Sequence, residues 1–438
     1  MKITPLEPWI SAKTGTAGLQ PTRESIRAYH LEKLRETISR ARTGSPFYRK
    51  HLAAISHNDL SSLEDLTYLP FTTSEDLTSG YLRFLCVSQN EISRVVTLHT
   101  SGTTGTPKRI CFTPEDQELT IDFFHHGMTT LVGPGERTLI LLPGERSGGV
   151  ADLLVRGLDR AGVAGIIHGP VRDIRETVDR MNRERITSLV GNPTEVLSLV
   201  RQGTVSTPPR TVLLSTDYVP ESIIEQVERT WGCRVYTHYG MTEMGYGGGV
   251  ECDARIGYHM READLFFEIV HPETGTPVEP GGWGEVVFTT LTREGMPLIR
   301  YRTGDISRFI PGSCPCGTVL KTMSRVKRRL AGNVVIAKGI TLNMAEIDEA
   351  LFRIDGLIDF SAEVTGNARS NCLHISARAI SGPGNEKMEI AIVQALDTLT
   401  MVQSAKSLGI LDIAVRTGTL NPADNAKRTL VDKRWSNL

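Results

Sequence analysis

The sequence predicts an α/β protein: a large N-terminal domain of βαβ units with a β-rich subdomain, and a small C-terminal α+β domain. In the middle of the chain, short apolar segments alternate with helical segments of about 10 residues, which is typical of parallel βαβ units. Residues Leu265–Phe309 carry strand-like runs between Gly and Pro turns. After the basic segment Arg325–Arg329, the apolar pattern predicts the order β-α-β-β-α-β, a complete small domain. We therefore expect domains at residues 1–328 and 329–438.

The individual elements follow from apolar spacing and turn residues. Residues 22–42 carry apolar side chains at helical spacing, and Thr113 followed by Pro114 begins another helix, as an N-cap and a first-turn proline do. The predicted strands of the βαβ region are Thr138–Leu142, Val163–Ile167, Ser188–Val190, Thr211–Leu214 and Arg234–Tyr236. The predicted helices between them are Val150–Ala161, Ile174–Glu184, Thr194–Arg201 and Glu221–Thr230.

The small C-terminal domain is predicted in the same way. Its predicted strands are Val334–Ile340, Leu357–Val364, Cys372–Ala379 and Leu411–Val415, and its predicted helices are Met344–Arg353 and Asn385–Leu399. Asn343 precedes the first of these helices as an N-cap, with Glu346 in the capping-box position.

Composition narrows the class of partner. The 438 residues include 49 Lys plus Arg and 50 Asp plus Glu, a net charge of −1. A basic excess, which nucleic-acid and membrane-surface proteins usually need, is therefore missing, and we expect small molecules or proteins as partners. The sequence contains no 18-residue apolar run, and residues 1–10 lack the apolar segment of a secretory signal. Seven scattered cysteines do not suit a disulfide scaffold, so we expect a reducing cytoplasm.

A phosphate-binding loop is predicted at Leu98–Lys108, LHTSGTTGTPK. An apolar strand runs into a loop of hydroxyl residues and glycines that ends in lysine, and such a loop can direct N–H groups and hydroxyls at phosphate oxygens. Pro107 stands where a Walker A loop needs its second glycine, so the loop is of another type. Its candidate nucleotide-binding residues are Thr100, Ser101, Gly102, Thr103, Thr104, Gly105 and Lys108.

Two further motifs carry groups that suit a nucleotide. In YGMTE, Tyr239 could stack on a purine, Thr242 could bond the α-phosphate, and Glu243 could hold Mg²⁺, which prefers carboxylate oxygens. In YRTGD, Asp305 offers two acceptor oxygens to the two hydroxyls of a ribose. A turn aspartate would be the simpler interpretation of Asp305 without the other two motifs.

In this order, TSGTTGTPK, YGMTE and YRTGD resemble the acyl-adenylate-forming superfamily. The short chain resembles its branch of phenylacetate–CoA ligase and coenzyme F390 synthetase, from about Ser45 onwards. The resemblance implies ATP-dependent, AMP-forming activation of a carboxylic acid, aryl or arylacetic, to an acyl-adenylate, followed by thioesterification with coenzyme A. It also implies a C-terminal domain that acts as a mobile lid and swivels about Arg325–Arg329.

The resemblance assigns further residues. Arg325 becomes a second ribose contact, and Asp217 lies on the adenine side. The lysine that acts in adenylation corresponds best to Lys427, although the serine and glycine expected beside it are absent and Arg428 and Lys433 compete. Transfer of the acyl group or AMP to a carrier protein, an amine or a hydroxyl stays open, as do a non-catalytic nucleotide-binding relic and a homodimer.

A metal site is predicted from four residues that the nucleotide site does not use. Cys314 and Cys316 form a Cys-Pro-Cys-Gly turn, and Cys252 and His259 lie upstream. Three thiolates and one imidazole would complete a closed tetrahedral Zn²⁺ site of structural type. The alternative is a set of unpaired thiols in the core.

Overall fold

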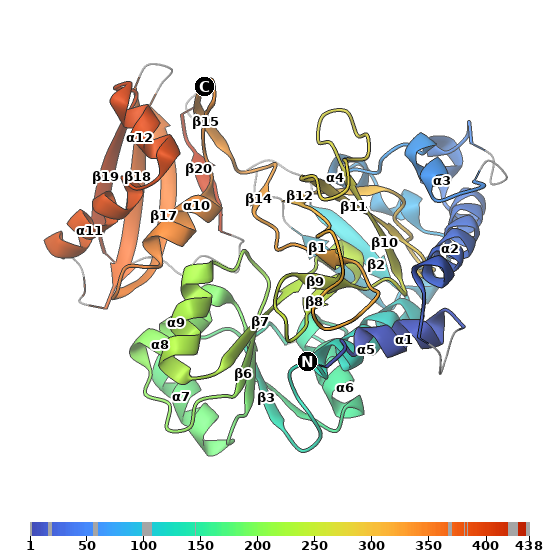
Figure 1. Ribbon diagram of the computed structural model, residues 1–438, viewed down its shortest axis with the longest axis horizontal. Helices are drawn as coiled ribbons and strands as arrows, with labels where there is room; N and C mark the ends of the chain where they lie inside the picture. Colours follow the sequence, from blue (N-terminus) through green and yellow to red (C-terminus); the bar gives the residue numbers. More distant parts are fainter. Residues whose placement is uncertain are drawn as a thin grey trace. The chain divides into compact units, whose positions relative to one another are not determined.

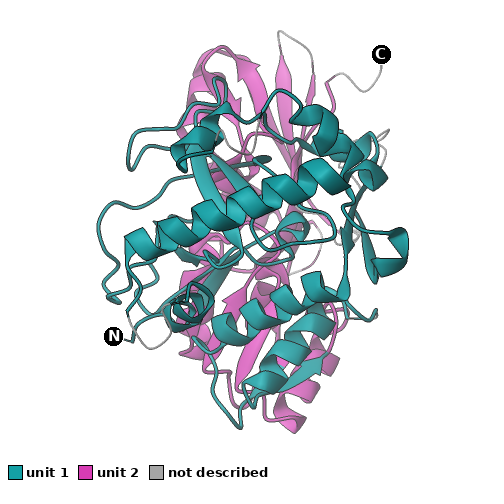
Figure 2. Ribbon diagram, turned by 90° about the vertical axis from the view of Figure 1, so that its right-hand side faces the viewer, with its two compact units in different colours: residues 1–138, 143–167, 236–326 teal, residues 139–142, 168–235, 327–438 magenta. Residues whose placement is uncertain are grey.

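The computed structural model describes residues 2–15, 20–55, 60–98, 107–144, 146–366, 370–380, 382, 384–418 and 428–434. Cα packing divides the chain into two units, coloured separately in Figure 2. Unit 1 comprises Met1–Thr138, Pro143–Ile167 and Tyr236–Val326, and unit 2 comprises Leu139–Leu142, His168–Val235 and Lys327–Leu438. One boundary between the units, at Val326/Lys327, falls inside the predicted hinge. The two domains predicted from the sequence are a different division of the chain and stay a prediction.

Unit 1 holds most of the N-terminal helices. Helix α5 begins where the sequence indicates, because Thr113 and Asp116 form a capping box around Pro114. The helices are α1 (Leu6–Lys13), α2 (Arg23–Gly44), α3 (Pro46–His51), α4 (Ser74–Thr78), α5 (Pro114–Met128) and α6 (Val150–Arg160). The short 3-10 helices are η2 (Glu64–Tyr68), η3 (Tyr81–Phe84), η4 (Gln89–Glu91) and η5 (Thr242–Met244).

The strands of unit 1 are mainly antiparallel. They are β1 (Arg94–Leu98), β2 (Lys108–Phe112), β4 (Ala164–Ile167), β8 (Gly249–Glu251), β9 (Tyr258–Met260), β10 (Leu265–Val270), β11 (Gly284–Thr290), β12 (Tyr301–Ser307) and β13 (Thr322–Met323). Strands β10, β11 and β12 pair as a meander, which is the predicted β-rich subdomain. Strands β8, β9 and β13 extend from the end of β7. One large apolar core lies between α2 and this meander (Figure 1).

Two strands pass from one unit to the other, β3 (Arg137–Ile140) and β7 (Arg234–Tyr239). Unit 2 then repeats strand and helix with α7 (Ile174–Arg183), β5 (Ser188–Gly191), α8 (Pro193–Gln202), β6 (Thr211–Leu214) and α9 (Glu221–Trp231). Strands β5 and β6 are parallel, as βαβ units require. Gly232 ends α9 in the left-handed conformation, at φ 64°.

The C-terminal part of unit 2 contains a four-stranded sheet in the order β19-β18-β17-β20. Its elements are β14 (Arg328–Arg329), β15 (Val334–Ala337), β16 (Ile340–Leu342), α10 (Met344–Leu351), β17 (Leu357–Gly366), β18 (Asn371–Ala379), α11 (Glu386–Leu396), α12 (Thr400–Ser407), β19 (Leu411–Thr417) and β20 (Leu430–Asp432). Helices α11 and α12 pack against β19 (Figure 1). Asn343 caps α10 as predicted.

Three details of this part differ from the sequence prediction. Val334–Ile340 is a hairpin and not one strand, because Gly339 takes a φ of +79° and turns the chain back. The helix predicted over Asn385–Leu399 ends at Leu396, and α12 begins anew at Thr400. Strand β20 pairs parallel with β17 and was not predicted, because three residues carry too short a pattern.

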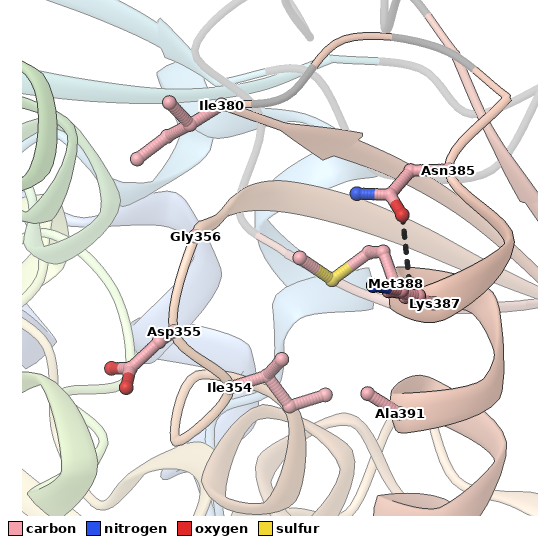
Figure 3. Close-up of a pocket in the computed structure, with 8 residues that line it drawn as sticks. All are labelled: Ile354, Asp355, Gly356, Ile380, Asn385, Lys387, Met388 and Ala391. Carbon is pink, nitrogen blue, oxygen red and sulfur yellow. Dashed lines mark hydrogen bonds between the residues drawn. The ribbon is translucent and has the colours of Figure 1, made fainter.

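The structure therefore confirms the predicted class, a mixed α/β fold with parallel and antiparallel sheets and a C-terminal α+β part. Across the described residues, every helix is too short or too polar to span a bilayer. A shallow groove of about 510 Å³ lies in unit 2 between the end of α10 and the start of α11 (Figure 3). Ile354, Ile380 and Met388 are among its lining residues, and the predicted site residues are not.

Candidate active site

The two ends of the predicted phosphate loop lie next to each other. Strands β1 and β2 form an antiparallel hairpin in which Leu98 pairs with Lys108. Lys108 is the first residue of β2, and its side chain is 13% exposed. Thr100, Ser101, Gly102, Thr103, Thr104 and Gly105 lie outside the described residues.

The ammonium group of Lys108 is surrounded by oxygen atoms. It donates to Glu243 Oε1 at very short range, to the Tyr301 hydroxyl at 3.1 Å and to Ser74 Oγ at 3.4 Å. The Glu243 carboxylate is 3% exposed, so the ion pair stands in a poorly hydrated place, where an unpaired charge would be costly. Lys108 and Glu243 come from the first and second motifs, and the structure brings them together.

Tyr301, the first residue of YRTGD and of strand β12, touches both charged groups. Its hydroxyl donates to Glu243 Oε1 at 3.1 Å. Burial, and then the Glu243 charge, raise the pKa of Tyr301 well above its ordinary value, so the phenol stays protonated. The backbone oxygen of Glu243 accepts from buried Arg293 at 2.8 Å. Helix η5, which carries Glu243 and the half-buried Thr242, is thereby held from the side of the β-rich subdomain.

Tyr239 and Asp305 form a second pair in unit 1. The Tyr239 hydroxyl, at the end of β7, donates to Asp305 Oδ2 on β12 at 3.1 Å. The Tyr239 ring stacks on Tyr258 with a centroid distance of 5.9 Å. Asp305 is 2% exposed and belongs to strand β12, so it is a buried strand residue and not an exposed turn aspartate. The predicted purine and ribose contacts are thus direct neighbours.

Arg325 is anchored by a buried carboxylate. Its Nε donates to Glu251 Oε1 at 2.8 Å, and the other Glu251 oxygen accepts the Thr237 N–H at 2.7 Å. Burial raises the pKa of Glu251, while Arg325 opposes that shift. Ser307 Oγ donates to Ser324 O at 2.7 Å, which ties the chain before Arg325 to strand β12, where Asp305 lies.

Asp217 belongs to unit 2, directly after β6. Its Oδ1 accepts the Tyr218 N–H and its Oδ2 accepts the Arg428 N–H, each at 2.8 Å. Lys427 lies outside the described residues, which resume at Arg428. The assignments of Asp217 to adenine and of Lys427 to adenylation stay predictions.

Cys252, His259, Cys314 and Cys316 form a compact buried cluster in unit 1. Their ligand atoms all lie within 4.8 Å of one another. Cys252 and Cys314 are 3.6 Å apart at sulfur, close to the roughly 3.7 Å that two thiolates have on one tetrahedral zinc ion. Cys316 Sγ lies 3.4 Å from His259 Nε2, and Thr322 Oγ1 contacts His259 Nδ1 at 3.4 Å, which orients the ring. The donor set and its spacing fit Zn²⁺.

Within the described residues, one other group of this kind occurs, Asp122, His125 and His126 on helix α5. The Asp122 carboxylate accepts Trp9 Nε1 at 2.9 Å and lies 3.0 Å from Lys13 Nζ. These contacts tie α1 to α5. A lysine ammonium at the carboxylate opposes cation binding there.

Several contributors were missed in the sequence. Tyr301 is the first residue of the YRTGD motif, and its place four residues before Asp305 is the signal that could have marked it. Ser74, Arg293 and Glu251 stand in no recognisable motif. The tertiary fold brings them into contact with Lys108, Glu243 and Arg325.

A model of the family described as AMP-binding enzymes matches residues 59–291, more than half of the chain. The chain belongs to the AMP-binding enzyme family. Membership confirms the resemblance inferred from the three motifs.

Relatives of this family member extend over most of its length. A phenylacetate–coenzyme A ligase of Thermus thermophilus is 28% identical over 351 residues, covering 77% of each chain. Another, of Escherichia coli, is 26% identical over 348 residues, covering 76% of this chain and 78% of that protein. The crystal structure of 2-hydroxyisobutyryl-CoA ligase with its acyl-adenylate superposes with a TM-score of 0.79 at 20% identity, over 94% of this chain and 90% of that one. The family member shares the fold of that ligase.

Proposed function

We propose that the protein is an ATP-dependent, AMP-forming acid–CoA ligase. In the first half-reaction, an oxygen of the carboxylate attacks the α-phosphorus of ATP, and pyrophosphate leaves with the electrons of the broken P–O bond. In the second, the coenzyme A thiol loses its proton and attacks the acyl carbon, and AMP leaves. The net products are a thioester, AMP and pyrophosphate.

One observation carries the proposal: three sequence motifs meet in one hydrogen-bonded group. Lys108 of the first motif, Glu243 of the second and Tyr301 of the third are mutually bonded, although Lys108 and Tyr301 are 193 residues apart in sequence. The two named sequence relatives are phenylacetate–coenzyme A ligases, which supports the same reaction class.

The Lys108–Glu243 pair is well suited to handle phosphate charge. Glu243 would hold Mg²⁺, which, when bound, would offset the negative charge of the phosphates. The buried Glu243 carboxylate would be open to Mg²⁺ once the Lys108 ammonium bonds phosphate oxygens instead, and the metal would then replace Lys108 as its positive partner. Lys108 and Thr242 would then bond phosphate oxygens, and the hydroxyl and glycine residues at 100–105 would supply further donors.

The remaining residues would hold the nucleoside. Asp305 would accept the ribose hydroxyls, with Arg325 beside it and Tyr239 against the purine. In unit 2, Asp217 would lie on the adenine side, and Lys427 would act in adenylation. The predicted swivel at Arg325–Arg329 would separate the two half-reactions and would exclude water from the acyl-adenylate. The names of the relatives favour an aryl or arylacetic acid as substrate.

We also propose that the cluster of Cys252, His259, Cys314 and Cys316 holds a structural zinc ion. Four protein ligands leave no position for substrate. The ion would join the turn after β8, strand β9 and the turn before β13. None of the seven cysteines, all of them among the described residues, forms a disulfide, which suits the proposed reducing cytoplasm. A homodimer stays a prediction.

The deciding experiment is a panel of carboxylic acids assayed for AMP release with and without coenzyme A. We expect an aryl or arylacetic acid to give AMP and an acyl-CoA in equal amounts. Acid-dependent ATP–pyrophosphate exchange without any CoA product would favour a carrier protein, amine or hydroxyl as the acceptor. Tight ATP binding without exchange for any acid would contradict the ligase and favour a nucleotide-binding relic.

A further inference from the structure

A contact in unit 2 joins two residues on opposite sides of the predicted domain boundary. The Asp217 carboxylate follows strand β6, and Arg428 precedes strand β20, 211 residues later. The Arg428 backbone N–H donates to Asp217 Oδ2 at 2.8 Å, and the Tyr218 N–H holds the other oxygen. The predicted adenine-side residue is therefore bonded to the C-terminal part of the chain.

The Arg428 side chain fixes that backbone in place. Its guanidinium donates to Asp348 on α10 at 3.0 Å and to Asp359 on β17 at 2.5 Å. The same group lies over the Phe360 ring, 4.4 Å from its centroid. Lysine, with one compact ammonium, could not reproduce this forked and stacked arrangement.

Three further contacts join the same two stretches of sequence. The Tyr218 hydroxyl donates to Glu349 on α10 at 2.8 Å, and Glu349 also accepts the Glu221 N–H at the start of α9. Arg201 on α8 donates to the Phe352 backbone oxygen at 2.8 Å. Each of these contacts, like the one between Asp217 and Arg428, joins a residue before position 328 to a residue after it. A swivel about Arg325–Arg329 would therefore have to break them all.

We propose that Asp217, Tyr218, Glu349 and Arg428 form a latch that holds the C-terminal part in the adenylating arrangement, with Arg428 as its positioning residue. This inference rests on the proposed ligase function. Asp217 is the predicted neighbour of adenine, so the latched arrangement is the one in which nucleotide and C-terminal chain meet. The transfer to coenzyme A requires the latch to open. Its strength therefore sets how the enzyme divides its time between the half-reactions.

The two half-reactions can be measured separately in the full-length enzyme. For Arg428→Lys, we expect kcat of acid-dependent ATP–pyrophosphate exchange to fall about tenfold or more, since hydrogen bonds to charged groups are strong. The KM for ATP should stay within about twofold, because a lysine keeps the backbone N–H that holds Asp217. CoA thioester formation from supplied acyl-adenylate should stay equal to wild type or rise.

A second variant keeps the test valid if Arg428→Lys folds poorly. Tyr218→Phe removes one hydroxyl from the latch and should lower exchange in the same direction, by about two- to fivefold. Asp397→Ala is the matched control, because Asp397 pairs with Lys406 inside the C-terminal part. An equal fall of both half-reactions, a loss confined to CoA transfer, or no change in either variant would overturn the latch. A wild-type enzyme without exchange for any acid would instead contradict the proposed function.

Discussion

The ammonium group of Lys108 lies against the carboxylate of Glu243, 135 residues away in sequence, in a largely buried position. The Tyr301 hydroxyl bonds both partners. A buried carboxylate needs a positive partner in each state of the enzyme. Lys108 is that partner in the structure, and a Mg²⁺ ion held by Glu243 would leave the Lys108 ammonium available to phosphate oxygens.

Replacement of Glu243 tests the metal assignment. In Glu243→Ala, we expect Mg²⁺-dependent ATP–pyrophosphate exchange to fall about 100-fold or more, because the metal loses its carboxylate and Lys108 its partner. Initial rates over a range of Mg²⁺ concentrations measure this. Glu294→Ala is the control, since that carboxylate is 54% exposed and pairs with Arg40. Full activity of Glu243→Ala would contradict the assignment.

Tyr301→Phe tests whether the Tyr301 hydroxyl orients the Glu243 carboxylate, because the substitution leaves the charge of Glu243 unchanged. The variant loses one hydroxyl, while the ring keeps its contact with Phe288 at 5.4 Å. We expect the Mg²⁺ concentration for half-maximal exchange to rise about three- to tenfold, since a carboxylate that loses one of its hydrogen bonds is oriented less well for metal. The free energy of unfolding should fall by about 1 kcal/mol. An unchanged Mg²⁺ dependence would show that the hydroxyl has no part in placing the metal ligand.

Most of the residues of the candidate active site could be predicted from the sequence, but the contacts between them could not. Lys108, Glu243 and Asp305 stand in short motifs, and each motif is visible in isolation. The partners Ser74, Glu251 and Arg293 carry no pattern, because their positions depend on contacts between distant segments. Thr113 and Asn343 were predictable as caps because capping involves residues three positions apart.

The errors in the fold have a similar cause. The Val334–Ile340 segment has an apolar pattern that a strand and a hairpin share, and only the φ of Gly339 separates them. Strand β20 is stabilised by its parallel partner β17 and not by its own three residues. The division into two units groups 168–235 with 327–438, a result of packing that no boundary composition indicates.

The cluster of Cys252, His259, Cys314 and Cys316 predicts bound zinc and a dependence of stability on that ion. Purified protein should contain one zinc ion per chain, by elemental analysis. Removal with a strong chelator, or Cys316→Ser, should lower Tm by about 5 °C or more, because bound metal stabilises the folded state. Cys233→Ser is the control, since Cys233 is outside the cluster. Purified protein that contains no zinc and has the same Tm with and without chelator would contradict the zinc site.

Two lysines near the C-terminus compete for the adenylation role. We expect Lys427→Ala to lower ATP–pyrophosphate exchange about 100-fold, while CoA transfer from supplied acyl-adenylate stays mostly intact. Lys433→Ala serves as the comparison, because Lys433 is exposed and pairs with Glu363 at 2.8 Å. Equal exchange rates in Lys427→Ala and wild type would reject Lys427, and a loss found in Lys433→Ala instead would move the role there.

The imidazole of His238 gives the fold a predictable sensitivity to acid. Burial lowers the pKa of His238 on strand β7 from 6.5 to about 4. The folded state therefore disfavours the protonated ring, so its contribution to stability is complete above pH 6.5 and is lost as the pH falls towards 4. We expect that loss to reach at most about 3 kcal/mol, and His238→Gln should remove it. Denaturant unfolding at pH 7.5, 5.5 and 4.5 measures the difference, with His271→Gln, at an exposed position, as the control. Parallel pH profiles for wild type and His238→Gln would show that His238 is not the residue that senses acid.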